Sequence, residues 1–210
     1  VLIHEQNAVL GRANRVLCRL GAHLATTFGG TRGVSKSTQA RTRKVGNPVR
    51  NDVLTAARGG YRYLNASRPF ELLIFGGSQG ASVFADTVPA AIGGLPADLK
   101  SRLRVVHQVR RADMAQTLAA YGEIGVYAEI RDFFDDLPSR MRRAHLVICR
   151  GGASTVCELS LLGAPAIIVP LPGSLDQDQA HNVRELNEKG GAWMVNQSDF
   201  TTEWLSGKLN

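Results

Sequence analysis

The sequence predicts an α/β protein built on a doubly wound parallel sheet, and three observations support this prediction. Short apolar and β-branched runs alternate with stretches of helical length from residue 71 onward. Glycine-rich turns follow two of the expected strands, as in 76–80 and 150–152. The chain is 44% hydrophobic with 22 glycines, which is typical of a globular α/β protein. Strands that alternate with helices pair in parallel and carry helices on both faces of the sheet.

The first 50 residues predict a smaller unit of the same kind, with strands at 1–3, 23–28 and 43–49, a helix over 8–20 and a loop over 29–42. We expect the apolar face of this helix to pack on a sheet, with its arginines in solvent; the alternative is a helix lying at a membrane interface. The apolar face comprises Val9, Leu10, Ala13, Val16, Leu17 and Leu20, and the opposite face carries Arg12, Arg15 and Arg19.

Residues 55–68 lack hydrophobic periodicity and contain Gly59-Gly60, which predicts a linker. We therefore expect two domains, 1–60 and 61–210. In the second domain the expected strands are 71–75, 104–108, 125–130, 146–149, 166–170 and 191–194, and the expected helices are 81–92, 112–121, 137–144, 178–189 and one that opens at Ser154. The turns 76–80, 133–136, 150–155 and 171–179 then share one edge of the sheet and converge on one cleft.

The stretch Arg150–Glu158 is the strongest candidate for a ligand site. A buried strand, two glycines and a new helix place unpaired N–H groups and the positive end of a helix dipole at one turn, which suits a phosphate. Glu158 is one turn beyond Thr155, where a carboxylate can accept hydrogen bonds from ribose hydroxyls. The alternative is that Thr155-x-x-Glu158 is a capping box, which needs no ligand.

Several other classes of site have no support in the sequence. Neither the dinucleotide fingerprint G-x-G-x-x-G nor a P-loop is present. The five histidines and three cysteines form no zinc-binding pattern and no evident catalytic pair, so we expect no metal and no cofactor. The cysteine spacing favours a reducing compartment. The polar run 176–182 instead suits a hydroxyl-rich sugar.

Charge is distributed unevenly along the chain. The net charge is +7, and residues 1–68 carry 12 Lys and Arg against two acidic residues, Glu5 and Asp52. This asymmetry indicates an anionic lipid surface, a diphosphate substrate or nucleic acid as partner, or an ordinary solvated basic face. Nucleic acid is the weakest of these because the basic segment has few aromatic residues and no recognition motif.

Five motifs occur in an order that resembles the MurG family, the bacterial N-acetylglucosaminyltransferases of peptidoglycan precursor synthesis. They are His4-Glu-Gln-Asn7, Gly46-Asn-Pro-Val-Arg50, Gly76-Gly-Ser-Gln-Gly-Ala81, Arg150-x-Gly-Ala-Ser-Thr-Val-x-Glu158 and Asp176-Gln-Asp-Gln…Asn182. The resemblance implies a GT-B fold, in which two Rossmann-like domains face each other across a cleft. Residues 1–60 would then be the end of the acceptor domain, and 61–210 a nearly complete donor domain.

The resemblance also implies an activity. Members transfer N-acetylglucosamine from UDP-N-acetylglucosamine to an undecaprenyl-diphosphate-linked muramyl pentapeptide, with inversion, at the cytoplasmic face of the inner membrane. The expected partners are these two substrates and an anionic membrane surface, to which the protein binds peripherally. Two alternatives stay open: another UDP-sugar enzyme of this fold, such as a lipid glycosyltransferase or a UDP-N-acetylglucosamine epimerase, and a UDP-sugar binding module without catalysis.

Carried over position by position, the resemblance assigns roles around the nucleotide sugar. The backbone at Phe134 would read uracil, Glu158 would bind ribose, and Asn7 and Arg50 would reach in from the first domain. The diphosphate would be held by Ser78, Ala153, Ser154 and Thr155, and the sugar by Asp178, Gln179 and Asn182. Position 178 is aspartate where some relatives have glutamine, which makes its sugar contact the least secure.

No catalytic residue is assigned within the chain. The family's N-terminal glycine-rich loop, with its histidine, has no counterpart in the sequence, and neither does its C-terminal helix. His4 lies in a different motif and is equally well explained as a structural hydrogen-bonding residue. We therefore expect the chain to be a fragment that binds the donor without transferring sugar.

Overall fold

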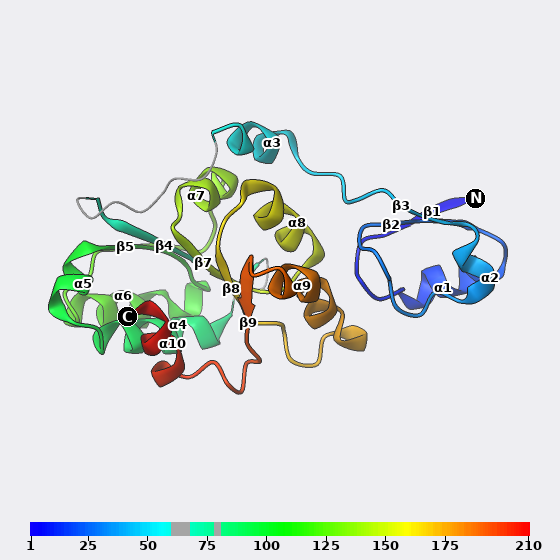
Figure 1. The fold of residues 1–210 in the computed structure, drawn as a ribbon. Coiled ribbons are helices and arrows are strands. Elements are labelled where there is room, and N and C mark those ends of the chain that lie inside the picture. Colours follow the sequence, from blue (N-terminus) through cyan, green and yellow to red (C-terminus); the bar gives the residue numbers. More distant parts are fainter. Residues whose placement is uncertain (60–67, 78–80) are drawn as a thin grey trace.

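The structure, a computed structural model, describes residues 1–59, 68–77 and 81–210. Two parallel sheets organise these residues (Figure 1), one of three strands in the order β1-β2-β3 and one of six in the order β6-β5-β4-β7-β8-β9. Helices alternate with the strands in both. The predicted α/β class with doubly wound parallel sheets is therefore confirmed. The expected domain boundary at residue 60 falls at the start of a segment outside the described residues.

The three-stranded unit is small and has a correspondingly small core. Its elements are β1 (Leu2–Glu5), α1 (Arg12–Arg19), β2 (His23–Thr26), α2 (Lys36–Gln39) and β3 (Thr42–Lys44). Leu10, Cys18 and Leu24 form the buried cluster, with Ile3 and Val34 packed against it. Leu2 and Glu5 of β1 pair with His23 and Thr26 of β2, which brings the ends of these two strands to the same edge.

Helix α1 corrects one prediction. It begins at Arg12 rather than Ala8, because residues 8–10 run extended and pair with Arg32 through two backbone hydrogen bonds. The buried side of α1 then contains Cys18, while Val16, Leu17 and Leu20 are 53%, 38% and 78% exposed. The expectation that these three side chains pack on the sheet was wrong.

Helix α3 (Asn51–Ala57) corrects the expected linker, which was drawn from residue 55. It packs across α7 (Leu137–Arg143) and α8 (Ala153–Leu162) of the large unit. Its Val53 is fully buried in the core beneath these helices. One buried side chain in seven residues produces no periodic stripe, so this helix left no recognisable pattern in the sequence. The remainder of the expected linker, 60–67, lies outside the described residues.

The large unit buries a separate cluster of side chains on each face of its sheet. Its strands are β4 (Phe70–Phe75), β5 (Leu103–Gln108), β6 (Ala128–Arg131), β7 (Leu146–Cys149), β8 (Ala166–Ile168) and β9 (Ala192–Met194). Its remaining helices are α4 (Ser82–Gly93), α5 (Ala97–Arg102), α6 (Met114–Glu123), α9 (Asp178–Glu188) and α10 (Thr202–Leu209), with short 3₁₀ turns at Arg111–Asp113 and Leu175–Gln177.

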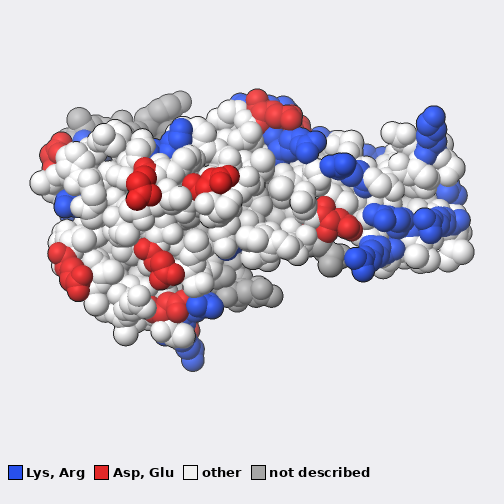
Figure 2. Space-filling model, turned by 90° about the horizontal axis from the view of Figure 1, so that it is seen from below, with Lys and Arg blue, Asp and Glu red and all other residues white. Residues whose placement is uncertain are grey.

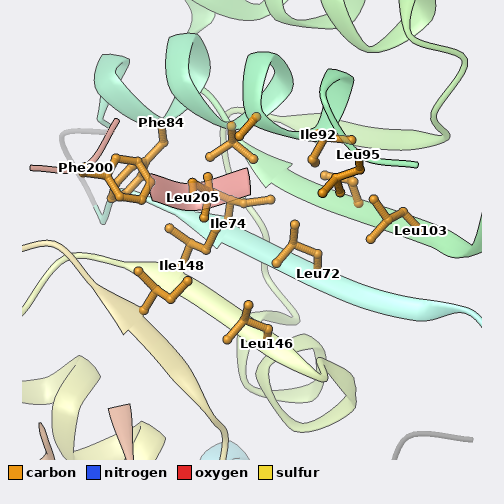
Figure 3. Close-up of a cluster of buried hydrophobic side chains, with 14 of the residues drawn as sticks. Leu72, Ile74, Phe84, Ile92, Leu95, Leu103, Leu146, Ile148, Phe200 and Leu205 are labelled. Atoms are coloured by element: carbon orange, nitrogen blue, oxygen red, sulfur yellow. The ribbon is translucent and has the colours of Figure 1, made fainter. Parts of the chain in front are cut away.

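Figure 3 shows the cluster beneath α4, where Phe84 and Ile92 face Ile74 of β4 and Ile148 of β7. Helix α10, which was not predicted from the sequence, packs on α4 and buries Leu205 in this cluster. The other face is covered by α3, α7, α8 and α9. Burial on both faces explains why β7 reads as a continuous apolar run rather than an alternating one.

Candidate functional site

The turn from β7 into α8 has the geometry expected of a phosphate-binding turn. All four residues of β7 are buried, and Gly152 is the N-cap of α8. No side chain caps this helix, so the N–H groups of Ala153, Ser154 and Thr155 are left for a ligand. The turn lies at the carboxyl edge of the sheet, where open α/β sheets bind ligands.

The same geometry excludes the capping-box alternative. With Gly152 as the N-cap, Thr155 is the third residue of α8 and Glu158 lies in its second turn, beyond the positions that a capping box uses. The Glu158 side chain is 13% exposed, and its Oε1 lies 3.7 Å from Nη2 of Arg50. Burial raises the pKa of Glu158, Arg50 opposes that shift, and Asp52 adds to it. Glu158 is thus a poorly solvated carboxylate that neither caps α8 nor pairs with another side chain of that helix.

Gly151 is a position where only glycine fits. A Cβ there would lie 2.8 Å from the carbonyl oxygen of Gln179 and 2.8 Å from Cγ2 of Val183, because α9 passes directly over the turn. Gln179 also binds the turn through its side chain: Oε1 accepts hydrogen bonds from Gly151 N (3.1 Å) and Leu171 N (2.9 Å). Since both bonds use the oxygen, the amide nitrogen of Gln179 is the group left to donate to a ligand.

The β8–α9 segment forms the neighbouring wall of the cleft. Asp176 and Gln177 both have left-handed backbone conformations, with φ of 54° and 55°, which non-glycine residues rarely adopt. They precede α9, whose first residue Asp178 accepts a hydrogen bond from Gln179 N at 2.7 Å. A hollow of about 500 Å³ lies beside this segment, lined mainly by 170–174 and 196–198. Arg150 organises this wall through bonds to the Val169 and Pro170 carbonyls and to Gln197.

Asn182, in the second turn of α9, joins the two units. Its side chain is buried, and it bonds to Ala8, Asn7 and Gly151. The structure therefore brings Asn7, Asn182, Gln179 and the Gly151 turn into direct contact. Arg50 reaches the same unit through Glu158.

Glu5 is a site residue whose role was missed from the sequence alone. Its buried carboxylate accepts hydrogen bonds from Asn7 N (3.0 Å), Gly11 N (2.8 Å) and Asn14 Nδ2 (2.9 Å). These bonds hold the loop between β1 and α1 that carries Asn7. His4 Nε2 donates to Gly46 O at 3.0 Å, which supports the structural interpretation of that histidine. A glutamate in an otherwise basic segment was the signal that could have found this role.

The segment between β6 and α7 carries Phe134, whose ring is buried. Arg140 lies 4.3 Å from the ring centroid and bonds to Glu129 at 2.7 and 3.1 Å and to Asp136 at 2.6 Å. The ring is therefore occupied by protein contacts, and the backbone is the part available to a base. In the sheet, β4 and β5 separate β6 from β7, so Phe134 lies further along the same edge.

Two further observations concern Ser78 and metal binding. Ser78, expected at the diphosphate, lies outside the described residues; the neighbouring Gly77 has φ of 78°. No group of three His, Cys, Asp or Glu side chains able to hold a metal ion occurs in the described part of the chain.

Comparison with known proteins places this geometry in a class. The sequence profile of the Glycosyltransferase family 28 C-terminal domain matches residues 71–210. The chain is 52% identical over 209 residues to a protein of Methylobacterium sp. (strain 4-46) named UDP-N-acetylglucosamine--N-acetylmuramyl-(pentapeptide) pyrophosphoryl-undecaprenol N-acetylglucosamine transferase, with 99% of this chain and 56% of the relative covered. A Methylobacterium nodulans protein of the same name is 51% identical, with the same coverage.

The crystal structure of Acinetobacter baumannii MurG superposes with a TM-score of 0.80 at 31% identity, covering 99% of this chain and 57% of that one. The fold is thus that of the GT-B glycosyltransferases, with strands and helices of two Rossmann-like units. The chain belongs to glycosyltransferase family 28. It spans a little over half the length of the relatives it matches.

Proposed function

We propose that the protein transfers N-acetylglucosamine from UDP-N-acetylglucosamine to an undecaprenyl-diphosphate-linked muramyl pentapeptide, with inversion at the anomeric carbon. The observation that carries this proposal is the uncapped N-terminus of α8, followed on the same helix by the largely buried Glu158 side chain. The names of the relatives supply the identity of the two substrates.

In this proposal different residues of the cleft bind different parts of the donor. The N–H groups of Ala153, Ser154 and Thr155 bind the diphosphate, and they oppose the charge that develops on the departing UDP. Glu158 accepts hydrogen bonds from the ribose, and the Phe134 backbone reads the uracil edge. In this proposal Gln179, Asp178 and Asn7 bind the sugar. Arg50, whose side chain is 59% exposed, can turn from Glu158 to the phosphates without losing buried contacts.

Membrane binding at the cytoplasmic face of the bacterial inner membrane is the second part of the proposal. Figure 2 shows Lys and Arg gathered at the end of the molecule that the three-stranded unit forms. On α1 and at its C-cap, the exposed side chains of Val16, Leu17 and Leu20 lie near the exposed Arg12 and Arg19. A surface that combines apolar and cationic groups suits an anionic lipid interface. In the described residues no helix has both the length and the apolar character needed to cross a bilayer.

Calorimetric titration with UDP and ADP tests the nucleotide assignment. We expect UDP to bind and ADP to bind much more weakly, because the base is read through backbone groups at Phe134. Equal affinities for UDP and ADP would contradict the assignment of a uridine nucleotide.

Transfer is tested in a chimera in which residues 1–210 replace the matching part of the Methylobacterium relative, since the chain spans about half of that protein. Radiolabelled N-acetylglucosamine should pass to a short-chain lipid acceptor as it does with the unaltered relative. An epimerised or hydrolysed sugar, formed without acceptor, would support the other UDP-sugar enzymes instead. Binding of UDP without any transfer would support the binding-module alternative.

A further inference from the structure

The carboxamide of Asn182 has every polar contact it needs from the protein. The residue is 1% exposed. Its Oδ1 accepts a hydrogen bond from Ala8 N at 2.7 Å, and its Nδ2 donates to Gly151 O and to Asn7 Oδ1, both at 3.1 Å. One side chain of α9 therefore holds both the loop after β1 and the turn after β7.

These contacts fix which way the two amides face. A backbone N–H can only donate and a carbonyl oxygen can only accept, so Ala8 and Gly151 together determine the orientation of the Asn182 amide. The second hydrogen on Asn182 Nδ2 then points to the Asn7 carboxamide. Of the two polar atoms of that carboxamide, only the oxygen can accept a hydrogen bond. Asn7 must therefore direct its oxygen toward Asn182 and its nitrogen away from it.

The backbone of Asn7 is fixed as well, because its N–H donates to the buried Glu5 carboxylate at 3.0 Å. The residue is partly exposed, and its Nδ2 donates to no group in the described part of the chain. We propose that Asn182 is a positioning residue, which sets the Asn7 carboxamide so that it presents two N–H donors to a hydroxyl or carbonyl oxygen of the transferred sugar. This inference rests on the proposed function, and it assigns to Asn182 a role through Asn7 rather than a direct sugar contact.

Calorimetry with UDP and UDP-N-acetylglucosamine on Asn7→Ala, Asn182→Ala and the double variant tests the proposal. A hydrogen bond contributes about 1 kcal/mol, so we expect each variant to bind UDP-N-acetylglucosamine roughly 2- to 10-fold more weakly. UDP, which lacks the sugar, should lose less affinity than UDP-N-acetylglucosamine in every variant, and the double variant should be no weaker than Asn182→Ala alone. Additive losses would mean that Asn182 contacts the sugar itself, and equal losses for both ligands would mean a merely structural role; either would overturn the proposal.

Two further variants separate positioning from folding. Asn182→Asp keeps the acceptor for Ala8 N–H but loses the two amide donors. It should therefore retain the contact with the Ala8 backbone. It should still lose the preference for UDP-N-acetylglucosamine over UDP. Asn187→Ala, on the same helix, removes only a bond to Met194 N within the large unit and should leave that preference intact. A preference retained in Asn182→Asp, or lost in Asn187→Ala, would contradict the assigned role.

Hydrogen exchange provides a readout without substrate. The amide of Ala8 should be protected in the parent, in Asn187→Ala and in Asn182→Asp, and should exchange faster in Asn182→Ala. Unchanged protection in Asn182→Ala would overturn the contact on which the inference depends. If the parent failed to bind UDP at all, the proposed function would fail, while the exchange result would still report on the contact.

Discussion

At the residue scale, the most informative group is Glu158. It lies on a helix that needs no cap from it, it is largely withdrawn from solvent, and its one cationic neighbour among the described residues is an exposed arginine 3.7 Å away. An ion pair with so exposed a partner contributes little to stability. The presence of a carboxylate at this position is therefore better explained by a ligand than by the fold.

The first prediction concerns Glu158→Gln. We expect UDP affinity to fall by roughly 1–3 kcal/mol, because charge-assisted hydrogen bonds to ribose are lost. Thermal stability should change little, since the amide is cheaper to bury than the carboxylate. Calorimetry and a melting curve on the same variant give both quantities. A loss of stability with affinity intact would assign Glu158 to the fold.

The second prediction is a pH dependence of the same contact. Burial raises the pKa of Glu158, so the carboxylate takes up a proton at a higher pH than an ordinary glutamate does. UDP affinity should fall as pH drops through that raised pKa, and the ionised group should cost folding stability as pH rises through the same interval. Titrations from about pH 8 to about pH 4.5 measure this effect. The phosphate of UDP ionises identically in the parent and in Glu158→Gln, so a parallel decline in both proteins would refute the assignment.

At the scale of elements, Arg140 anchors the part of the β6–α7 segment that carries Phe134. Arg140 is 12% exposed, pairs with both Glu129 and Asp136, and covers the Phe134 ring. Its hydrogen bonds lower the pKa of each carboxyl group. The backbone proposed to read uracil thus depends on an ionic network within one βα unit.

Arg140→Ala should loosen this segment. We expect a loss of about 1–3 kcal/mol in the free energy of unfolding, because two carboxylates lose their shared donor. UDP affinity should fall while affinity for inorganic pyrophosphate, which has no base, is retained. Arg143→Ala is the control, since Arg143 is 44% exposed and lies 3.9 Å from Asp136. Equal effects of the two substitutions on UDP binding would contradict the role given to Arg140.

The elements also differ in how far they could be predicted from the sequence. The buried strands and the turn at Gly151 were predictable, because a continuous apolar run followed by paired glycines is typical of a buried parallel strand that ends in a tight turn. Helices α3 and α10 were not, since each buries one fully enclosed side chain, Val53 or Leu205, and leaves no periodic stripe. The bonds of Asn182 to Asn7 and Ala8 were out of reach, because they join residues whose proximity is decided by how the two units pack. The bonds of Glu5 are local, and a glutamate in a basic segment was the signal for them. The ligand contacts expected of the candidate site residues all stay predictions, and Ser78 lies outside the described residues.

At the scale of the whole molecule, charge and apolar exposure coincide on the three-stranded unit. Figure 2 shows positive groups gathered on the three-stranded unit. The same unit carries the exposed Val16 and Leu17 of α1, while the large unit carries the proposed nucleotide-binding turn. Under the proposed function, this arrangement would separate a surface for lipid from a cleft for a soluble nucleotide. The two are connected through Asn182 and through α3.

The chain should sediment with anionic vesicles at low salt and be released at high salt, since surface charge attraction is screened within about 10 Å at 0.1 M salt. Reversing Arg12 and Arg19 to glutamate should weaken this binding strongly. Reversing Arg104 and Arg111, on the large unit, serves as the control and should have a smaller effect. If sedimentation did not change with salt, or fell equally after reversal of either arginine pair, the basic groups of the three-stranded unit would form an ordinary solvated surface.

The consecutive left-handed residues Asp176 and Gln177 have a consequence for laboratory evolution. A non-glycine residue in this conformation stores about 1–3 kcal/mol of strain, and asparagine or glycine relieves it. A screen for heat resistance alone would therefore favour Gln177→Asn or Gln177→Gly over most surface substitutions. The same screen would act on a wall of the proposed sugar-binding cleft, so we expect heat tolerance and discrimination among sugars to conflict at this one turn.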